Sequence, residues 1–348
     1  MKNNELEIYP LSMVWEDLMF INFSMDPQQL QKMLPKGMDL DLFEDKAYIT
    51  IAPLTMKGFA FKKLSTFFNP SFYECNLRTY VRVNEKVGVY FFSLDAESLL
   101  EVLGAKALFH LNYRYRTIYF NLEKGVFRFE MRKAFSRKKT TIIEAKIAKE
   151  EQPHDPFTSF ISDRSLYFVK NKGHLYQGKV FHPPWKFQKI QEIKLQTDLL
   201  KDYKIGRECY AIYAKHTEVQ ANFIQPNQPP ILFYDKNCGL CSSAIRLLMV
   251  LDIYKFLRFA PLEGKTYAKF FSTPPIKDRL YLVEDNGKSN GARALLNLLD
   301  YLPWFLGFLV ILELIPEKTL EKWYDWIALK RKSCPLKPKQ LKDDRCLP

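Results

Sequence analysis

The feature that most constrains the fold is a proline-rich stretch, Gln225-Pro-Asn-Gln-Pro-Pro230, which separates two different patterns of hydrophobic residues. Three prolines with polar spacers and no apolar period are typical of a linker. A chain of 348 residues also exceeds the size at which a single hydrophobic core is usual. The sequence therefore predicts two domains, at residues 1–225 and 231–348, joined by a linker at 226–230.

Before the linker, short runs of aromatic and β-branched residues alternate with turn residues. Such spacing is typical of an antiparallel sheet that curls into a barrel. Asp26 is expected to cap the first helix of this part. We expect strands at residues 46–52, 77–83, 88–94, 117–122, 126–131 and 140–146, and helices at 27–34, 96–107 and 157–163.

After the linker, the apolar pattern alternates between strands and helices. This alternation indicates an α/β domain, and a helix directly after the first strand matches a thioredoxin-like layout. The whole chain is thus expected to be a two-domain α+β protein. We expect strands at residues 231–234, 256–260 and 279–284, helices at 242–251 and 264–271, a turn at 285–287, and mostly helix beyond it.

Two cysteines lie three positions apart where the first strand of the second domain gives way to its helix, in Asp235-Lys-Asn-Cys238-Gly-Leu-Cys241. If Cys238 begins the helix, the helix end favours its thiolate, and Cys241 lies within bonding reach. Cys238 would then attack a disulfide, and Cys241 would resolve the mixed disulfide. Asp235 is expected either to cap the helix or to move protons on and off the thiol.

Alternative roles for this cysteine pair are weaker. A Cys-x-x-Cys pair is also half of a zinc site, but the other cysteines of this domain, Cys334 and Cys346, do not form a second close pair. We therefore expect neither a metal ion nor an organic cofactor. Two inert buried thiols are the other alternative, which would leave the helix start unexplained. Cys75 and Cys209 in the first domain are expected to be core thiols.

The charge and the longest apolar run limit the classes of partner. The chain has 52 Lys and Arg against 39 Asp and Glu, a net charge of +13, but these basic residues are scattered, so no nucleic-acid partner is expected. The first residues lack the order of a secretion signal, which favours the cytoplasm. The apolar run at 301–316 is too short to cross a bilayer and is expected to be a buried helix, with an interfacial anchor as the alternative.

The second domain resembles the DCC family of thiol-disulfide oxidoreductases. The matching segments are Phe233–Cys241, Phe259–Leu262 and Trp323–Arg331. The resemblance implies a thioredoxin-like fold and a dithiol site at Asp235, Cys238 and Cys241. The chain departs from thioredoxins in that no proline directly precedes the strand at 279–284.

The first domain resembles an uncharacterised bacterial family related to acetoacetate decarboxylase, through the segments Leu34–Asp41, Glu74–Val81, Gly88–Ala96 and His174–Trp185. The resemblance implies a closed or cone-shaped barrel with a central cavity. Decarboxylases of that kind use a lysine that forms a Schiff base. Tyr113 stands where that lysine is expected, and Lys106 would replace it only if it pointed into the cavity.

Three polar residues of the first domain, Glu74, Asn76 and Arg78, alternate along a predicted strand and therefore share one face. If that face points inward, they form a site for a small ligand together with Tyr113. The alternative is that they face solvent while Cys75, Leu77 and Thr79 pack inward. His182 is expected to be a hydrogen-bonded residue at a strand end.

These observations predict a thiol-disulfide oxidoreductase that exchanges disulfides with protein or small-molecule clients, fused to a barrel that binds a small anionic ligand and lacks the decarboxylase lysine. One alternative is a ligand-binding module in which the dithiol is a passive redox sensor. Another is a lyase that acts on keto acids.

Overall fold

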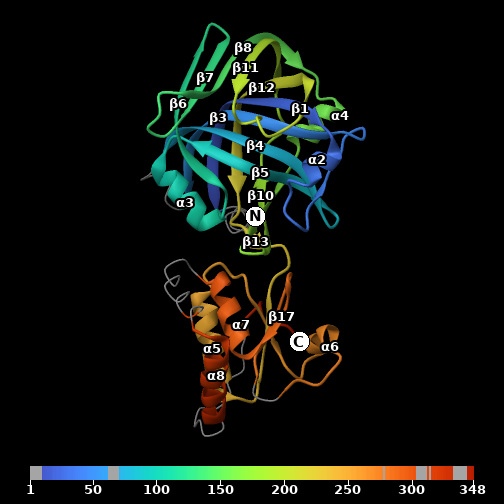
Figure 1. The fold of residues 1–348 in the computed structure, drawn as a ribbon, viewed down its shortest axis with the longest axis vertical. Coiled ribbons are helices and arrows are strands. Elements are labelled where there is room, and N and C mark those ends of the chain that lie inside the picture. The colour runs from blue at the N-terminus through green and yellow to red at the C-terminus, as the bar shows by residue number, and fades with distance from the viewer. Residues whose placement is uncertain (1–9, 62–69, 277–278, 303–311, 313–314, 332–342) are drawn as a thin grey trace. The chain divides into compact units, whose positions relative to one another are not determined.

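The computed structural model describes residues 10–61, 70–276, 279–302, 312, 315–331 and 343–348. The chain forms two compact units, and Figure 1 shows the elements of each. Unit 1 comprises residues 1–170 and 177–224, and unit 2 comprises residues 171–176 and 225–348. A short segment from the middle of the chain therefore belongs to the second unit.

Unit 1 is mostly β, as expected. The strands of the first sheet follow the order β13-β10-β9-β5-β6-β7-β8-β11-β12-β1-β3-β4-β2, with additional pairings of β10 with β12 and of β5 with β4. Their bounds are β1 Leu11–Met25, β2 Asp39–Leu40, β3 Ala47–Phe61, β4 Ser71–Val83, β5 Lys86–Ala96, β6 Tyr113–Glu123, β7 Val126–Lys133, β8 Lys139–Gln152, β9 Leu166–Asn171, β10 His174–Phe181, β11 Phe187–Thr197, β12 Ile205–Ala221 and β13 Gln225–Pro226.

The sheet is not purely antiparallel, which corrects the expectation from the sequence. Strand β5 pairs in parallel with β6 and with β9. Helix α3 (Leu99–Phe109) lies between β5 and β6 in the chain, and such a crossover allows two consecutive strands to run in the same direction.

Among the described residues, three helices accompany the first sheet, and they lie at its periphery in Figure 1. Helix α2 (Pro27–Gln31) begins after Asp26, whose carboxylate accepts a hydrogen bond from the Gln29 amide, so the predicted cap is confirmed. Helix α4 (Pro156–Ser162) is capped in the same way by Asp155. In each helix a proline occupies the first turn, where its missing N–H costs no hydrogen bond.

Strand β4 is buried on both faces. Cys75 and Leu77 pack into a hydrophobic cluster with residues of β1, β3, β7 and β8. Glu74, Asn76 and Arg78, which alternate with them, are also buried but on the opposite face, where they line a cavity. The alternative that Glu74, Asn76 and Arg78 face solvent is therefore wrong, although Cys75 and Leu77 are buried as that alternative expected.

Unit 2 contains a four-stranded mixed sheet in the order β15-β14-β16-β17. Strand β14 pairs in parallel with β15 and antiparallel with β16, and β16 pairs antiparallel with β17. In Figure 1, α5, α7 and α8 are drawn on one side of this sheet and α6 on the other. The bounds are β14 Ile231–Tyr234, α5 Gly239–Leu251, β15 Arg258–Pro261, α6 Lys265–Phe270, β16 Tyr281–Glu284, β17 Gly287–Asn290, α7 Gly291–Leu298, the 3₁₀ helix η1 Leu299–Tyr301 and α8 Glu317–Arg331.

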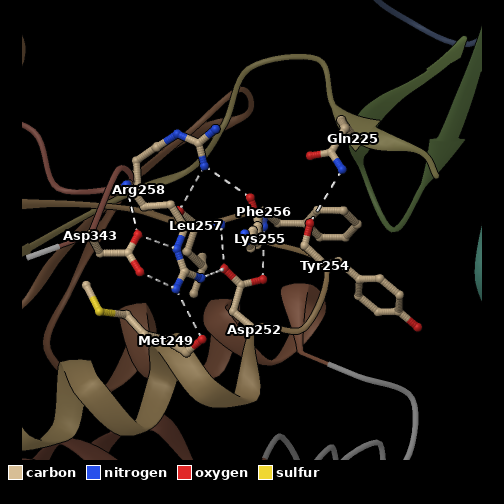
Figure 2. A network of polar contacts seen from close by, with 10 residues as sticks. Gln225, Met249, Asp252, Tyr254, Lys255, Phe256, Leu257, Arg258 and Asp343 are labelled. Atoms are coloured by element: carbon tan, nitrogen blue, oxygen red, sulfur yellow. Dashed lines mark hydrogen bonds and ion pairs between the residues drawn. The ribbon is translucent and has the colours of Figure 1, made fainter. Parts of the chain in front are cut away.

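A buried polar network fixes the C-terminal end of α5 (Figure 2). Asp252 accepts hydrogen bonds from the backbone amides of Phe256 and Leu257, both at 2.9 Å. Arg345 pairs with Asp252 at 3.2 Å and with Asp343 at 2.9 Å, and it donates to the Met249 carbonyl. Residues close to the end of the chain are thus part of the support of the helix that carries the cysteine pair.

The segment 171–176 brings a histidine into unit 2. His174 lies 3.0 Å from a carboxylate oxygen of Asp285 and 2.9 Å from the Tyr301 hydroxyl, and Tyr301 donates to Glu284. Burial disfavours the charged imidazole, but hydrogen bonds to Asp285 and Asp300 outweigh it and raise the pKa of His174 to about 9. A cationic histidine therefore balances a cluster of carboxylates in this unit.

Some expectations are not met or lie outside the described residues. Cys209 is exposed rather than a core thiol. The strand β17 was not predicted, since Asn286-Gly287 was expected to lead into helix. Most of the apolar run at 301–316, and Cys334, lie outside the described residues. Within the part of the chain that is described, no helix is long and apolar enough to cross a membrane.

Candidate functional site

The cysteine pair lies at the N-terminus of α5. Cys238 is the N-cap residue with an extended backbone, and its sulfur accepts a hydrogen bond from the Cys241 amide at 3.2 Å. Cys238 is partly exposed, whereas Cys241 is buried with 6% of its surface accessible. One sulfur is thus open to a client while the other is shielded, and a backbone N–H points at the exposed one.

Asp235 does not cap α5, which corrects one of the two roles considered for it. Its carboxylate accepts a hydrogen bond from the Asn237 amide at 2.9 Å, and its carbonyl accepts one from the Cys238 amide at 3.3 Å. These contacts form the tight turn that leads from β14 to the helix. Because Cys238 itself caps the helix, the Asp235 carboxylate stabilises the turn before the helix instead.

Ser242 is a supporting residue that the sequence reasoning missed. Its hydroxyl donates to the Cys238 carbonyl at 2.7 Å, and its amide donates to the same oxygen at 3.0 Å. The side chain is buried. A serine in the first turn after the motif was the available signal, and its effect is to hold the backbone of Cys238 in place.

The second candidate site is a cavity of about 130 Å³ in unit 1. All four residues predicted to bind a ligand, Glu74, Asn76, Arg78 and Tyr113, line it. Glu74, Asn76 and Arg78 come from β4, and Tyr113 comes from the start of β6. The alternation of a strand places the first three side chains on one face, and the pairing of β5 with both β4 and β6 brings Tyr113 near.

Glu74 and Tyr113 form a buried hydrogen-bonded pair. The Tyr113 hydroxyl donates to a Glu74 carboxylate oxygen at 2.8 Å, and only 3% of Glu74 is exposed. Burial raises the pKa of Glu74 to about 7, although hydrogen bonds from Tyr113 and Asn76 partly oppose this. Burial also raises the pKa of Tyr113 well above its ordinary value. The carboxyl group of Glu74 therefore gains or loses its proton near neutral pH.

Arg78 occupies another part of the cavity wall. It donates to the Ile161 carbonyl at 2.9 Å, and its guanidinium lies 4.6 Å from the centre of the Phe20 ring. Burial lowers the pKa of Arg78, but an arginine stays charged. Its Nε atom and the Oδ1 atom of Asn76 are buried without a hydrogen-bond partner among the described residues.

The rest of the cavity wall is mainly apolar and aromatic and was not predicted. It comes from strands far apart in the sequence, so no local pattern could have identified it. Trp185 lies against Trp15 and Phe20. Other lining residues include Met56, Phe72, Phe91, Leu94, Phe109, Leu166, Tyr167 and Val180.

The cavity does not offer the lysine of a Schiff-base decarboxylase. Lys106 is exposed, and none of the described residues that line the cavity is a lysine. His182 lies at the end of β10 and lines the cavity, while its Nδ1 is 2.9 Å from the Pro183 carbonyl. Among the residues that the structure describes, no cluster of three or more His, Cys, Asp or Glu side chains is arranged to hold a metal ion.

Solved structures with a similar course of the chain include an enduracididine biosynthesis enzyme and an acetoacetate decarboxylase. The enduracididine biosynthesis enzyme MppR is similar with a TM-score of 0.49 and 9% identity, over 63% of this chain and 88% of that one. An acetoacetate decarboxylase from Legionella pneumophila is similar with a TM-score of 0.47 and 11% identity, over 62% of this chain and 86% of that one.

Family models match both parts of the sequence. Residues 12–234 match the DUF2071 family, described as an uncharacterized conserved protein, and residues 232–337 match the DCC1-like thiol-disulfide oxidoreductases. The uncharacterized protein YqjF of Bacillus subtilis (strain 168) is 30% identical over 199 residues, which cover 55% of this chain and 80% of that protein. The family resemblances stated from the sequence are confirmed, and the chain belongs to the DUF2071 family, with a second region that matches the DCC1-like thiol-disulfide oxidoreductases.

Proposed function

We propose that the chain is a thiol-disulfide oxidoreductase that works through Cys238 and Cys241. The observation that carries the proposal is the hydrogen bond from the Cys241 amide to the Cys238 sulfur at the start of α5. A sulfur that accepts a backbone N–H at a helix N-terminus is stabilised as the thiolate, which is the reactive form. The difference in exposure between the two sulfurs supports the assignment of Cys238 as the attacking residue.

The reaction transfers two electrons from the cysteine pair to the client. The Cys238 thiolate attacks a client disulfide, a mixed disulfide forms, and the first client sulfur leaves as a thiolate and takes up a proton. The Cys241 sulfur loses its proton and attacks Cys238, and the second client sulfur leaves. The client is then a dithiol and the pair a disulfide, which an external dithiol must reduce. In the cytoplasm, the expected location, small thiols keep the pair reduced.

The fold proposals rest on the order of the strands. In unit 2, a parallel pair β14–β15 joined by α5, and an antiparallel hairpin β16–β17 followed by α7, support a thioredoxin-like domain. In unit 1, the pairing of β5 with β4 as well as with β6 supports a sheet that closes on itself, as a barrel does.

The test is reduction of insulin disulfides with dithiothreitol as electron donor. Cys238→Ser should abolish the enzyme-dependent rate, and Cys241→Ser should slow turnover and accumulate a mixed disulfide that mass spectrometry detects. Cys209→Ser is the matched control, because Cys209 is an exposed thiol in unit 1. If Cys238→Ser reduces insulin as fast as the parent protein, the proposal is wrong, and the pair is better described as a passive redox sensor.

A second candidate function is the binding of a small ligand in the cavity of unit 1. The observation that favours it is the set of polar groups that face the cavity, in which Trp15, Asn76, Arg78 and Glu101 each have a buried atom without a hydrogen-bond partner among the described residues. Enclosed, mainly apolar cavities with a few polar groups are typical of small-molecule sites. A lyase that works through a Schiff base has less support, since no described lining residue is a lysine.

A further inference from the structure

Arg78 carries a buried positive charge that the described residues do not neutralise. Only 8% of the residue is exposed, and among the residues that the structure describes it forms no ion pair. Burial lowers the pKa of Arg78, and the charge of the nearby Arg164 lowers it further. Arg164 forms an ion pair with Asp41, and Asp41 also forms one with Arg82. A buried cation without a counter-charge is costly, so this region of the cavity favours an anion.

The side-chain oxygen of Asn76 is a second group in the cavity that lacks a hydrogen-bond partner among the described residues. Asn76 is 7% exposed, and its amide nitrogen is oriented by the hydrogen bond that it gives to Glu74. This leaves its Oδ1 atom as a buried acceptor without a partner among the described residues, and a carboxylate oxygen of Glu101 in the same wall is also unpartnered. Buried acceptors normally accept a hydrogen bond. In this cavity a donor group on the ligand would supply it.

The space between these groups is apolar and of limited size. Aromatic side chains such as Phe20, Phe91 and Trp185 form much of the wall, and the cavity volume is about 130 Å³. Such a wall favours a hydrocarbon or aromatic body over a sugar or a nucleotide. A single uncompensated guanidinium matches a monoanion such as a carboxylate better than a phosphate dianion.

We propose that the cavity binds a small monocarboxylic acid with an apolar body that also carries a hydroxyl or amino donor. This inference rests on the proposed binding of a small ligand in unit 1 and names the class of ligand. The carboxylate pairs with Arg78, the donor satisfies the Asn76 Oδ1 atom, and the apolar body lies against the aromatic wall. Thiol-disulfide exchange in unit 2 is not needed for it.

The first test compares three probes on the full chain by isothermal titration calorimetry. 3-Phenyllactate has the acid and the donor, 3-phenylpropanoate lacks the hydroxyl, and 2-phenylethanol lacks the carboxylate. We expect 3-phenyllactate to bind about tenfold more tightly than 3-phenylpropanoate, and about tenfold to a hundredfold more tightly than 2-phenylethanol, as expected for a neutral and a charged hydrogen bond.

The second test changes the protein. Arg78→Met keeps most of the side-chain volume, and it should reduce the affinity for 3-phenyllactate about tenfold or more while it leaves 2-phenylethanol unchanged. Asn76→Leu should remove the preference for 3-phenyllactate over 3-phenylpropanoate. Arg128→Met is the matched control, because Arg128 lies outside the cavity and is half exposed. If Arg78→Met does not fold, the comparison of probes on the parent chain still decides the question.

The outcomes distinguish the assignment of an acid as the ligand from the ligand-binding function of the cavity. Equal binding of 2-phenylethanol and 3-phenyllactate, unaffected by Arg78→Met, would show that the cavity binds apolar molecules and would overturn the assignment of an acid. No binding of any of the three probes, with the cavity tryptophans Trp15 and Trp185 unperturbed in fluorescence, would overturn both this assignment and the ligand-binding function.

Discussion

Replacement of Glu74 by glutamine should change the pH dependence of the stability of unit 1. Burial raises the pKa of Glu74 from an ordinary value of 4.5 to about 7 in the folded protein. The folded state therefore binds more protons than the unfolded state between these values, and stability falls as the pH rises through this range. The gap corresponds to about 3 kcal/mol in total, of which about 2.5 kcal/mol is lost between about pH 5 and about pH 8.

The glutamine in Glu74→Gln cannot ionise, so this variant does not lose that stability as the pH rises. The variant should gain about 2.5 kcal/mol relative to the parent protein when the pH rises from about 5 to about 8. Stability of unit 1 alone can be read from urea unfolding followed by labelling of Cys75 with dithiodipyridine, because that thiol is fully buried in the folded unit. The disulfide reagent also reacts at acidic pH.

Glu74→Leu is the control for packing, because it is also neutral but has a different shape. Its absolute stability will differ from that of Glu74→Gln, yet the change with pH relative to the parent should be the same. If the difference between either variant and the parent is equal at both pH values, Glu74 does not titrate near neutrality, and the argument from burial is refuted.

Three further outcomes are expected. Tyr113→Phe removes the donor that lowers the pKa of Glu74, so the carboxyl should titrate above pH 7 when followed by carbon-13 NMR. Arg345→Met should destabilise unit 2 by about 3 to 5 kcal/mol in urea unfolding, because it leaves the Asp252 carboxylate buried without its cation. The raised pKa of His174 adds stability that is complete below about pH 6.5 and is lost as the pH rises through about 9, so His174→Gln should flatten the unfolding profile in that range.

Two of these outcomes have controls within the chain. Arg258→Met removes an arginine that, among the described residues, hydrogen-bonds backbone carbonyls near Asp252 and no carboxylate (Figure 2), and it should cost less than Arg345→Met. Equal costs would contradict the importance assigned to the buried charge. A profile for His174→Gln that still falls between about pH 6.5 and about pH 9 would assign the titration to another group.

The sequence was sufficient where the physics is local. A strand with period two predicted that Glu74, Asn76 and Arg78 share a face, and the placement of Cys238 after an apolar strand predicted that it begins a helix. The helix start at Asp26 followed from capping chemistry. In each case the outcome depends on residues within a few positions of each other.

The sequence was insufficient where partners are distant. Trp15 and Trp185 meet in the cavity wall although 170 positions separate them, and no period in the sequence connects them. Cys209 was expected to be buried, but its position in β12 is exposed to solvent. One of the two roles expected for Asp235, capping of the helix, is fulfilled by Cys238 instead, since a sulfur is rarely considered as a cap.

The membership of His174 in unit 2 has a practical consequence for dissection of the protein. A fragment that starts at the proline-rich stretch would keep Glu284, Asp285 and Asp300 but lose the imidazolium that they surround. Three carboxylates would then repel one another at neutral pH, and such a truncated piece should be recovered more readily in acidic buffer. Expression of unit 2 by itself is therefore better served by a polypeptide that also supplies residues 171–176.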